Sequence, residues 1–484
     1  MYRAYVTHVT NIRPAANADR LNACEVFGNT TIIDKTIAED TLVLYLPSDG
    51  QISVEFGEKN NLFRRKDDAG NNVGGFIDPI KRNITAIRLR GNRSDGLVLP
   101  ISCLNYCYAH GDASIELRAG DVIDGLVNGH EICQKYIPRT QNRVGHVTEG
   151  NKTRKARPSV SPLFKEHADT EQLAYNLGAF KPGDHIEVSL KMHGTSQRTG
   201  YLPVFKGYKR TFLDWLFRRQ GTPVYEYGYV SGTRRVVLEN YEGGFYGNNE
   251  FREQHSKTFE GKLWKGETVY YEVVGFTTSG APIMGDASNK KLNDKEFIKQ
   301  YGETTRFSYG CEPNPKNLII ADPNADEVAG IHIPLAPQSD IYVYRMTMTN
   351  PDGEVVEYTP DFMRYRCEQM AVKCVLVFWN GIIPEVDEAI YVDKNDNDEC
   401  DEGETAYVRP VEAGEWVREL AEQYYDGPDP VGKTHVREGV VVRIINRPKF
   451  CAYKHKNFSF KVLEGIIKDA AAAPDMEEAQ DVTE

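Results

Sequence analysis

The first candidate for chemistry is Lys191, which opens the hexapeptide KMHGTS at residues 191–196. It follows an alternating run in which Ile186, Val188 and Leu190 occupy every second position. Because successive side chains of a strand point to opposite faces, this pattern predicts a strand that buries one face and presents Lys191 on the other. A lysine amine that has lost its proton can attack phosphorus and carry a nucleotide covalently.

The same hexapeptide offers further groups to a ligand. Gly194 lets the backbone approach a ligand closely, and Thr195 and Ser196 add hydroxyls. By itself, however, the hexapeptide is also compatible with a surface lysine in a turn. The case for a reactive lysine therefore depends on residues elsewhere in the chain.

Two downstream strands each carry a carboxylate among apolar residues. Glu272 lies in the middle of TVYYEVVGF at 268–276, and Glu438 directly precedes the run GVVV at 439–442. Burial of a carboxylate is costly unless the group is paired, hydrogen-bonded or bound to metal, so both are candidate site residues. Glu438 suits Mg²⁺, which prefers oxygen ligands and water.

Two lysines, Lys454 and Lys456, are separated by one residue in YKHKNFSF at 453–460. On a strand they point the same way, about 6.6 Å apart, and two ammonium groups at one pocket favour a polyphosphate ligand. For each of these acids and lysines, a salt-bridged acid or a solvated edge strand stays an open alternative.

Length and composition indicate a globular protein of more than one domain. The 484 residues exceed what most single cores support, and no run of 18 apolar residues predicts a membrane span. The nine cysteines form no CxxC pair and are odd in number, which favours reduced thiols. The amino terminus has no signal-peptide pattern, so we expect a cytoplasmic protein without membrane partners.

The net charge of −12 is concentrated in two places. Residues 385–404 hold ten acids and one lysine, and residues 469–484 hold six acids and no base. Such runs are typical of solvated or disordered segments. The acidity of the whole chain therefore does not exclude a nucleic-acid ligand.

Alternation and helical periodicity predict an α+β protein. Short strands are expected at 5–9, 30–33, 42–46, 84–89 and 96–100, and helices near 166–177, 362–377 and 415–425. Residues 135–165 are polar and basic with little periodicity, which predicts an interdomain linker.

Taken in order, these segments resemble the covalent nucleotidyltransferase superfamily of ATP-dependent ligases and mRNA capping enzymes. KMHGTS resembles its nucleotidyl-lysine motif, with His193 where Asp is usual, as in nick-sealing RNA ligases. YYEVVGF, EGVVVRI and KHKNFSF resemble motifs III, IV and V. The residues YVYR at 342–345 and SGTRR at 231–235 occupy the places of motifs IIIa and Ia.

The amino-terminal half is similar to the Deinococcus-type RNA ligases, which carry an OB domain before the catalytic one. The similarity lies in NADRL at 17–21, AIRLRG at 86–91 and SDGLVLP at 94–100. It implies an OB-like β-barrel followed by an ATP-grasp-like nucleotidyltransferase domain built on antiparallel sheets. The expected parts are an RNA-binding domain at 1–134, a basic linker at 135–165, the catalytic domain at 166–465 with the acidic insertion 385–404, and a disordered acidic tail at 466–484.

The resemblance implies an ATP-dependent RNA ligase that joins a 3′-hydroxyl to a 5′-phosphate, at nicks in RNA-containing duplexes, through lysyl-AMP and RNA-adenylate intermediates. The implied cofactors are ATP and Mg²⁺ or Mn²⁺, and the implied partner is RNA. The protein is expected to be a monomer in the cytoplasm, which would be the cytoplasm of a host if the gene is viral. The implied catalytic residues are Lys191, His193, Glu272, Glu438, Lys454 and Lys456. The implied nucleotide contacts are Leu190, Lys191, Met192, Gly194, Arg234, Arg235, Glu272, Tyr344, Lys454 and Lys456. The implied metal ligands are Glu438 and Glu272.

Three alternatives stay open. A capping guanylyltransferase would use GTP, and a DNA ligase would accept a 3′-deoxy terminus. Both place an OB domain after motif V, where this sequence leaves too few residues. A catalytically inactive RNA-binding protein would keep the fold alone, which the intact set of lysines and acids disfavours.

A basic segment surrounds Trp215 and stands apart from these motifs. Its cations either extend an RNA-binding surface or belong to an amphipathic helix that covers the fold, and both interpretations stay open. They are Lys206, Lys209, Arg210, Arg218 and Arg219.

Overall fold

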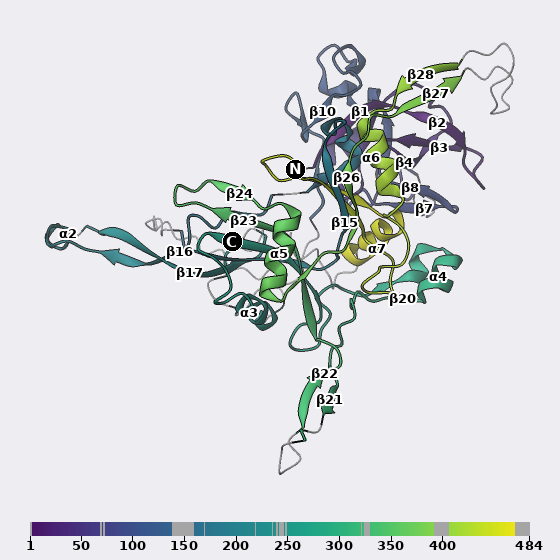
Figure 1. The fold of residues 1–484 in the computed structure, drawn as a ribbon. Coiled ribbons are helices and arrows are strands. Elements are labelled where there is room, and N and C mark those ends of the chain that lie inside the picture. Colours follow the sequence, from purple (N-terminus) through teal and green to yellow (C-terminus); the bar gives the residue numbers. More distant parts are fainter. Residues whose placement is uncertain are drawn as a thin grey trace. The chain divides into compact units, whose positions relative to one another are not determined.

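The computed structural model describes residues 2–67, 70, 73–137, 159–168, 170–217, 219–234, 236–238, 241, 246, 249–320, 322, 323, 330–391 and 406–469 (Figure 1). The chain divides into two compact units, each assembled from segments distant in sequence. Unit 1 lies within Met1–Thr140, Ala287–Thr305 and Phe458–Asp475, and unit 2 within Gln141–Asp286 and Arg306–Asn457. Residues 287–305 and 458–465 of the predicted catalytic domain thus pack with the amino-terminal segment.

Unit 1 is built mainly from short antiparallel strands. A four-stranded sheet has the order β10-β1-β5-β9 and a three-stranded sheet the order β2-β3-β4, with two-stranded pairs β13-β6, β11-β12, β7-β8 and β19-β20. The strands are β1 (Ala4–His8), β2 (Thr10–Pro14), β3 (Leu21–Val26), β4 (Asn29–Asp34), β5 (Leu42–Leu46), β6 (Gly50–Ile52), β7 (Ile87–Leu89), β8 (Asn92–Ser94), β9 (Leu97–Pro100), β10 (Val122–Ile123), β11 (Leu126–Val127), β12 (His130–Glu131), β13 (Cys133–Lys135), β19 (Ala287–Ser288) and β20 (Thr304–Thr305). The helices are α1 (Val54–Lys59), α4 (Lys295–Tyr301) and α7 (Phe458–Asp469), with 3-10 turns η1 (Ile101–Cys107), η2 (Ala113–Ile115) and η5 (Asn289–Leu292).

Alternation along the strands creates the core of unit 1. Val6 of β1 and Leu44 and Leu46 of β5 are fully buried and pack with Ile52 and Phe56. The strands predicted at 5–9, 30–33, 42–46 and 96–100 are confirmed to within one or two residues, whereas only Ile87–Leu89 of the predicted strand 84–89 is extended. Apolar periodicity at these positions reflects real burial.

The predicted OB-like barrel is not reproduced as a closed sheet. Within the described part of unit 1, strand pairing does not link the sheets into a barrel, so the OB assignment stays a prediction. Most of the predicted linker, residues 138–158, lies outside the described residues, as do residues 392–405 of the acidic insertion and 470–484 of the tail. The described end of the tail, up to Asp469, belongs to helix α7.

The first sheet of unit 2 has the order β14-β30-β29-β15-β26. Its strands are β14 (Glu171–Gln172), β15 (His185–Leu190), β26 (Val377–Ile382), β29 (Gly439–Ile444) and β30 (Cys451–Lys456). One face carries Ile186, Val188, Val440 and Val442, which pack against Val417 and other apolar residues of α6 (Ala413–Glu422). This packing confirms the strand predicted before Lys191 and the face it buries.

The second sheet of unit 2 has the order β17-β16-β18-β23-β24, with β25 paired in parallel to β23. Its strands are β16 (Thr195–Lys209), β17 (Thr222–Gly232), β18 (Glu267–Gly275), β23 (Ser339–Thr349), β24 (Val355–Glu357) and β25 (Lys373–Cys374). Tyr271, Val273 and Val343 pack on one face with residues of α3 (Glu250–Lys257) and α5 (Pro360–Met370). The antiparallel sheets and flanking helices give unit 2 the expected α+β class.

Three hairpins extend from this framework. The longest joins β16 to β17 and carries the short helix α2 (Phe212–Leu216) at its far end (Figure 1). The others are β21 (Asn317–Ile320) with β22 (Ile331–Pro334), and β27 (Asp387–Tyr391) with β28 (Ala406–Pro410). The strand β27 lies within the predicted acidic insertion.

The helix predictions succeed in part. Helix α6 matches the predicted 415–425, and α5 matches the first half of 362–377 but ends where Ala371 adopts φ 55°. The helix predicted at 166–177 is wrong, because Glu171–Gln172 pairs with β30 and is followed by 3-10 turns η3 (Leu173–Tyr175) and η4 (Leu177–Ala179). Strand pairing here outweighs local helical periodicity. Among the described residues, no helix is long and apolar enough to cross a membrane.

Candidate active site

The centre of the site lies where three adjacent antiparallel strands end. Leu190 of β15 pairs with Val440 of β29, and Gly439 of β29 pairs with Lys456 of β30. The N–H of Lys191 continues this ladder by donating to the Gly439 carbonyl oxygen at 3.0 Å. The register therefore brings Lys191, Glu438 and Lys456 to one end of the sheet, although Lys191 is more than two hundred residues from the other two in sequence.

The Glu438 carboxylate is shared among the cationic groups gathered here. Its Oε1 lies 2.8 Å from Lys191 Nζ and 3.3 Å from Lys456 Nζ, and its Oε2 lies 3.6 Å from His193 Nδ1. The Glu438 side chain is 2% exposed, whereas Lys191 is 24% exposed. A buried anion thus holds the lysine amine in place while leaving it accessible.

The two lysines decide the ionisation of Glu438. Burial alone raises the pKa of a carboxyl, but the charges of Lys191 and Lys456, with His193, outweigh it and lower the pKa of Glu438 to about 2. The carboxylate is therefore ionised at neutral pH. No hydrogen bond from the described residues reaches its Oε2, which leaves one anionic oxygen able to accept a further cation or a water.

The hexapeptide 191–196 is the crossing between the two sheets of unit 2. It leaves β15 at Leu190 and enters β16 at Thr195. At Gly194 a Cβ atom would lie 2.4 Å from the Val273 carbonyl oxygen and 2.8 Å from Glu272 Cγ. Glycine is therefore required for this close approach, which brings the second predicted acid, Glu272, next to the crossing.

The sheet facing this crossing places Tyr344 near Glu272. Ser196 pairs with Glu272, and a register shift in β23 leaves Tyr344 bulged between the pairs Tyr270–Arg345 and Tyr271–Val343. The Tyr344 hydroxyl lies 2.9 Å from Ser196 Oγ, whereas Val343 is fully buried in the core. A bulge of this kind aims a side chain toward a site.

The remaining predicted residues occupy the same region. Lys454 lies on β30 opposite Val441, two residues before Lys456, so both lysines project from one face of that strand. Leu190 and Met192, on either side of Lys191, are buried and anchor it. Arg235 lies outside the described residues.

Arg234 lies beside a buried histidine and two other arginines. Its carbonyl oxygen accepts a hydrogen bond from His167 N–H at 3.2 Å. Burial, followed by the charges of Arg345, Arg234 and Arg198, lowers the pKa of His167 well below its usual value, so this imidazole is neutral. The Tyr344 ring lies 5.2 Å from the His167 ring, which connects this cationic group to the bulged tyrosine.

The aromatic side chains that pack around His193 were not predicted from the sequence. The Tyr309 hydroxyl oxygen accepts a hydrogen bond from His193 N–H at 2.7 Å, and Phe307 packs edge-on against the His193 ring at 4.6 Å. Burial raises the pKa of Tyr309 well above its usual value, so the phenol stays neutral. His435 packs against both aromatic rings, at 5.1 and 4.7 Å. Phe307 and Tyr309 are two residues apart in the sequence, but nothing local indicates that they pack against His193.

A second unpredicted residue, Arg252 of α3, fixes the start of β16. Its guanidinium donates to Thr195 Oγ1 at 2.5 Å and to the Ser196 carbonyl oxygen at 3.0 Å, and it is fully buried. These bonds satisfy the hydroxyl of Thr195 and a backbone carbonyl of the hexapeptide. Rigid support of this kind holds the crossing strand in one position.

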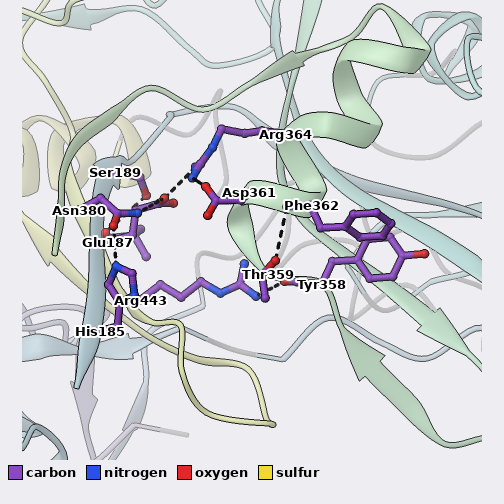
Figure 2. A network of polar contacts seen from close by, with 11 residues as sticks. His185, Glu187, Ser189, Tyr358, Thr359, Asp361, Phe362, Arg364, Asn380 and Arg443 are labelled. Atoms are coloured by element: carbon purple, nitrogen blue, oxygen red, sulfur yellow. Dashed lines mark hydrogen bonds and ion pairs between the residues drawn. The ribbon is translucent and has the colours of Figure 1, made fainter. Parts of the chain in front are cut away.

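The polar face of the first sheet is tied to α5 and the segment before it (Figure 2). Arg364 of α5 donates to Glu187 Oε2 at 2.7 Å, and Asn380 donates to the same oxygen at 3.2 Å. Arg443 of β29 donates to the Tyr358 carbonyl oxygen at 3.0 Å. The bonds of Arg364 and Arg443 connect the polar face of the first sheet to α5 and its preceding segment, which pack on the second sheet.

The site has no preformed metal cage. No group of three or more His, Cys, Asp or Glu residues in the described part of the chain is arranged to hold a metal ion. Mg²⁺ is, however, usually bound by one or two carboxylates together with waters and substrate phosphates. The anionic Oε2 of Glu438 and the nearby Glu272 fit that donor set.

Comparison with known proteins relates this fold to RNA ligases. No family model and no curated protein matches the chain. The structure of a Naegleria gruberi RNA ligase with PPi is similar at a TM-score of 0.51 and 15% identity, covering 94% of this chain and 97% of that chain. A lysine-to-methionine mutant of the same ligase with AMP and Mn is similar at a TM-score of 0.50 and 13% identity, covering 95% and 97%. At these identities the likeness concerns the fold.

Substitution Gly194→Ala tests the close approach of the crossing to β18. The new methyl group would push against the Val273 backbone, so we expect a loss of about 1–3 kcal/mol in the free energy of unfolding. Chemical denaturation measures this loss. Gly178→Ala is the matched control, because a Cβ there meets nothing within 4 Å; equal stability of the two variants would contradict the predicted crowding.

The ionisation of Glu438 predicts a dependence of stability on pH. Because its pKa is lowered from 4.5 to about 2, its contribution is present above pH 4.5 and is lost as the pH falls toward 2. The stability advantage of the wild type over Glu438→Gln should shrink by about 2 kcal/mol between pH 6 and pH 3. Denaturation curves at each pH measure it, with the exposed Glu385→Gln as control. An advantage independent of pH would refute the ion-pair assignment.

Proposed function

We propose that this protein is an ATP-dependent RNA ligase that uses Lys191 as its nucleotide carrier. The observation that carries the proposal is the accessible Lys191 amine, held 2.8 Å from a buried carboxylate beside a second lysine. This arrangement occurs in a chain with the fold of the Naegleria gruberi RNA ligase, and it supports covalent nucleotidyl transfer.

In the first step, Lys191 Nζ attacks the α-phosphorus of ATP. An N–P bond forms, the bond from the α-phosphorus to the bridging oxygen breaks, and pyrophosphate leaves. The amine must first lose its proton, because an ammonium has no lone pair. A cation that binds Glu438 would compete with Lys191 for the carboxylate, and its charge would favour the neutral amine, whose proton passes to solvent.

Lys454 and Lys456 are proposed to bind the phosphates. Both lie at one end of the first sheet, where their charges would stabilise the negative charge that develops on the α-phosphate and on pyrophosphate. Lys456 contacts the same carboxylate oxygen as Lys191, so a phosphate held by Lys456 lies within reach of the nucleophile. This proximity aligns the reacting groups before the reaction.

Glu438 and Glu272 are proposed as ligands of Mg²⁺ or Mn²⁺, and the solved neighbours were obtained with AMP and Mn or with PPi. The metal would neutralise phosphate charge. Glu272 also lies close to Gly194 and opposite Ser196, where it can bind the ribose. The other proposed nucleotide contacts are Leu190, Met192, Gly194, Tyr344 and Arg234 or Arg235.

Tyr344 is proposed to pack on the adenine ring. Its bulged position, with the hydroxyl on Ser196, places the ring on the face of the second sheet that carries Glu272. His193 and either Arg234 or Arg235 are proposed to orient the 5′-phosphate of RNA in the following step. In that step the AMP moves from Lys191 to the 5′-phosphate, and a 3′-hydroxyl then displaces AMP to seal the strand.

The substrate is proposed to be RNA with a 3′-hydroxyl and a 5′-phosphate, preferably at a nick. The strand-rich amino-terminal segment, residues 1–134, is proposed to bind the duplex through phosphates and 2′-hydroxyls as OB domains do. The nick preference follows from a separate binding domain placed before the catalytic residues.

Incubation with α-labelled ATP and Mg²⁺, without RNA, tests the covalent step. We expect a labelled, acid-stable protein adduct that is absent from Lys191→Met and unaffected in Lys181→Met, which changes an exposed lysine in the same unit. Gel electrophoresis measures the label. Labelling by GTP alone would instead indicate a capping guanylyltransferase, and absence of any adduct would reject the mechanism.

A nick-sealing assay tests the substrate. A duplex whose 3′-hydroxyl strand is RNA should be sealed, and the same duplex with a deoxyribose at that terminus should be sealed at least about tenfold more slowly if the 2′-hydroxyl is read. Denaturing gels measure the joined product. Equal rates on both would favour a DNA ligase.

A further inference from the structure

The tip of the β16–β17 hairpin exposes a cluster of large apolar side chains. Helix α2 and the residue after it present five such side chains, all more than half exposed. They are Phe212 (73%), Leu213 (59%), Trp215 (67%), Leu216 (54%) and Phe217 (61%). The interpretation of this segment as a helix that covers the fold is therefore wrong, because these side chains face solvent.

Several polar groups of the tip are hydrogen-bonded within the tip itself. Thr211 Oγ1 accepts from the N–H of Asp214, and the Asp214 carboxylate accepts from the N–H and the hydroxyl of Thr211 at 2.9 and 2.7 Å. The N–H groups of Trp215 and Phe217 donate within the turn, at 3.0 and 2.9 Å. A segment that enters an apolar medium must satisfy its backbone in this way.

Cationic residues flank the apolar tip in the sequence. Between residues 206 and 219 the sequence holds five basic residues and one acid, in a chain whose net charge is −12. The side chains of Lys206, Lys209, Arg210 and Arg219 are exposed. The one acid, Asp214, is engaged by Thr211, which lowers its pKa through hydrogen bonds. The local charge is thus opposite in sign to that of the whole protein.

We propose that this tip is a membrane-docking element that inserts into the surface of a bilayer with anionic headgroups. The apolar side chains, which include Trp and Phe, suit contact with acyl chains, and the neighbouring Lys and Arg suit contact with phosphate headgroups. Two signals, apolar burial and attraction to anionic lipid, act together on one small element. The contact is peripheral and needs no spanning helix.

The composition of the tip favours lipid over RNA. A platform for single-stranded RNA presents flat aromatic faces to successive bases. Here the Phe212 and Trp215 rings already contact each other, at 5.9 Å between centroids, and Leu213 and Leu216 add aliphatic surface that stacks on no base. The aliphatic side chains gain most from an acyl environment.

A second exposed apolar hairpin, β21–β22, shows why charge matters. Ile319 and Ile331 are 60% and 57% exposed. Residues 317–335, however, contain three acids and neither lysine nor arginine. Anionic headgroups would repel that hairpin, so it serves as a matched control rather than a second candidate.

Vesicle co-sedimentation of the full chain tests the proposal. We expect binding to phosphatidylcholine vesicles that contain about 30% phosphatidylserine, much weaker binding to pure phosphatidylcholine, and weakening at high salt. The double variant Leu213→Gln/Trp215→Gln should bind at least about tenfold more weakly, and Ile319→Gln should bind like the wild type. Quenching of Trp215 by brominated lipid, lost in Trp215→Phe, would place this residue in the acyl region.

Three results would overturn the proposal. Vesicle binding that is absent, or equal in the wild type and the double variant, would exclude a lipid contact at the tip. A double variant that loses affinity for an RNA oligonucleotide, measured by fluorescence anisotropy, with vesicle binding unchanged would assign the arm to RNA. Self-association in analytical ultracentrifugation that the double variant abolishes, without vesicle binding, would assign it to a second copy. Thermal unfolding confirms that each variant is folded.

Discussion

A buried carboxylate that must be neutralised organises the site. Glu438 lies among apolar strands with 2% of its side chain exposed, and such an anion is stable only when cations and hydrogen bonds compensate its lost hydration. Lys191 and Lys456 provide that compensation, from the ends of two different strands. The register of β15, β29 and β30 and the position of the nucleophile therefore depend on the same electrostatic requirement, and removal of Glu438 would take this ion pair from both lysines.

Each of the two sheets of unit 2 contributes residues to the site. The first carries the lysines and Glu438, and the second carries Glu272 and Tyr344. The hexapeptide 191–196 joins them, with Gly194 pressed against β18 and Arg252 bonded to its final residues. The bonds of Glu187 and Arg443 to α5 and its preceding segment brace the same crossing (Figure 2). Small shifts between the sheets would thus change every distance at the site together.

Local patterns predicted much of the fold. Alternation identified β15, β18, β29 and β30, and amphipathic periodicity identified α6, because both patterns record which side chains face a core. The helix predicted at 166–177 failed because pairing of Glu171 and Gln172 with β30 supplies backbone hydrogen bonds that the sequence cannot display. The position of Tyr344 likewise depends on a β-bulge, whose register shift moves one side chain to the opposite face.

The reactive groups can be identified along the chain: a lysine after a strand, two acids within apolar runs, and a pair of lysines separated by one residue. These features are local, since residue type and alternation can be read directly from neighbouring positions in the sequence. The simultaneous contacts of Glu438 with Lys191 and Lys456 emerge only on folding. The same is true of the packing of Tyr309, Phe307 and His435 around His193. The tertiary structure also decided that the residues around Trp215 face solvent. Contacts of this kind join residues remote in sequence, and their geometry follows from strand register and packing, which no single segment encodes.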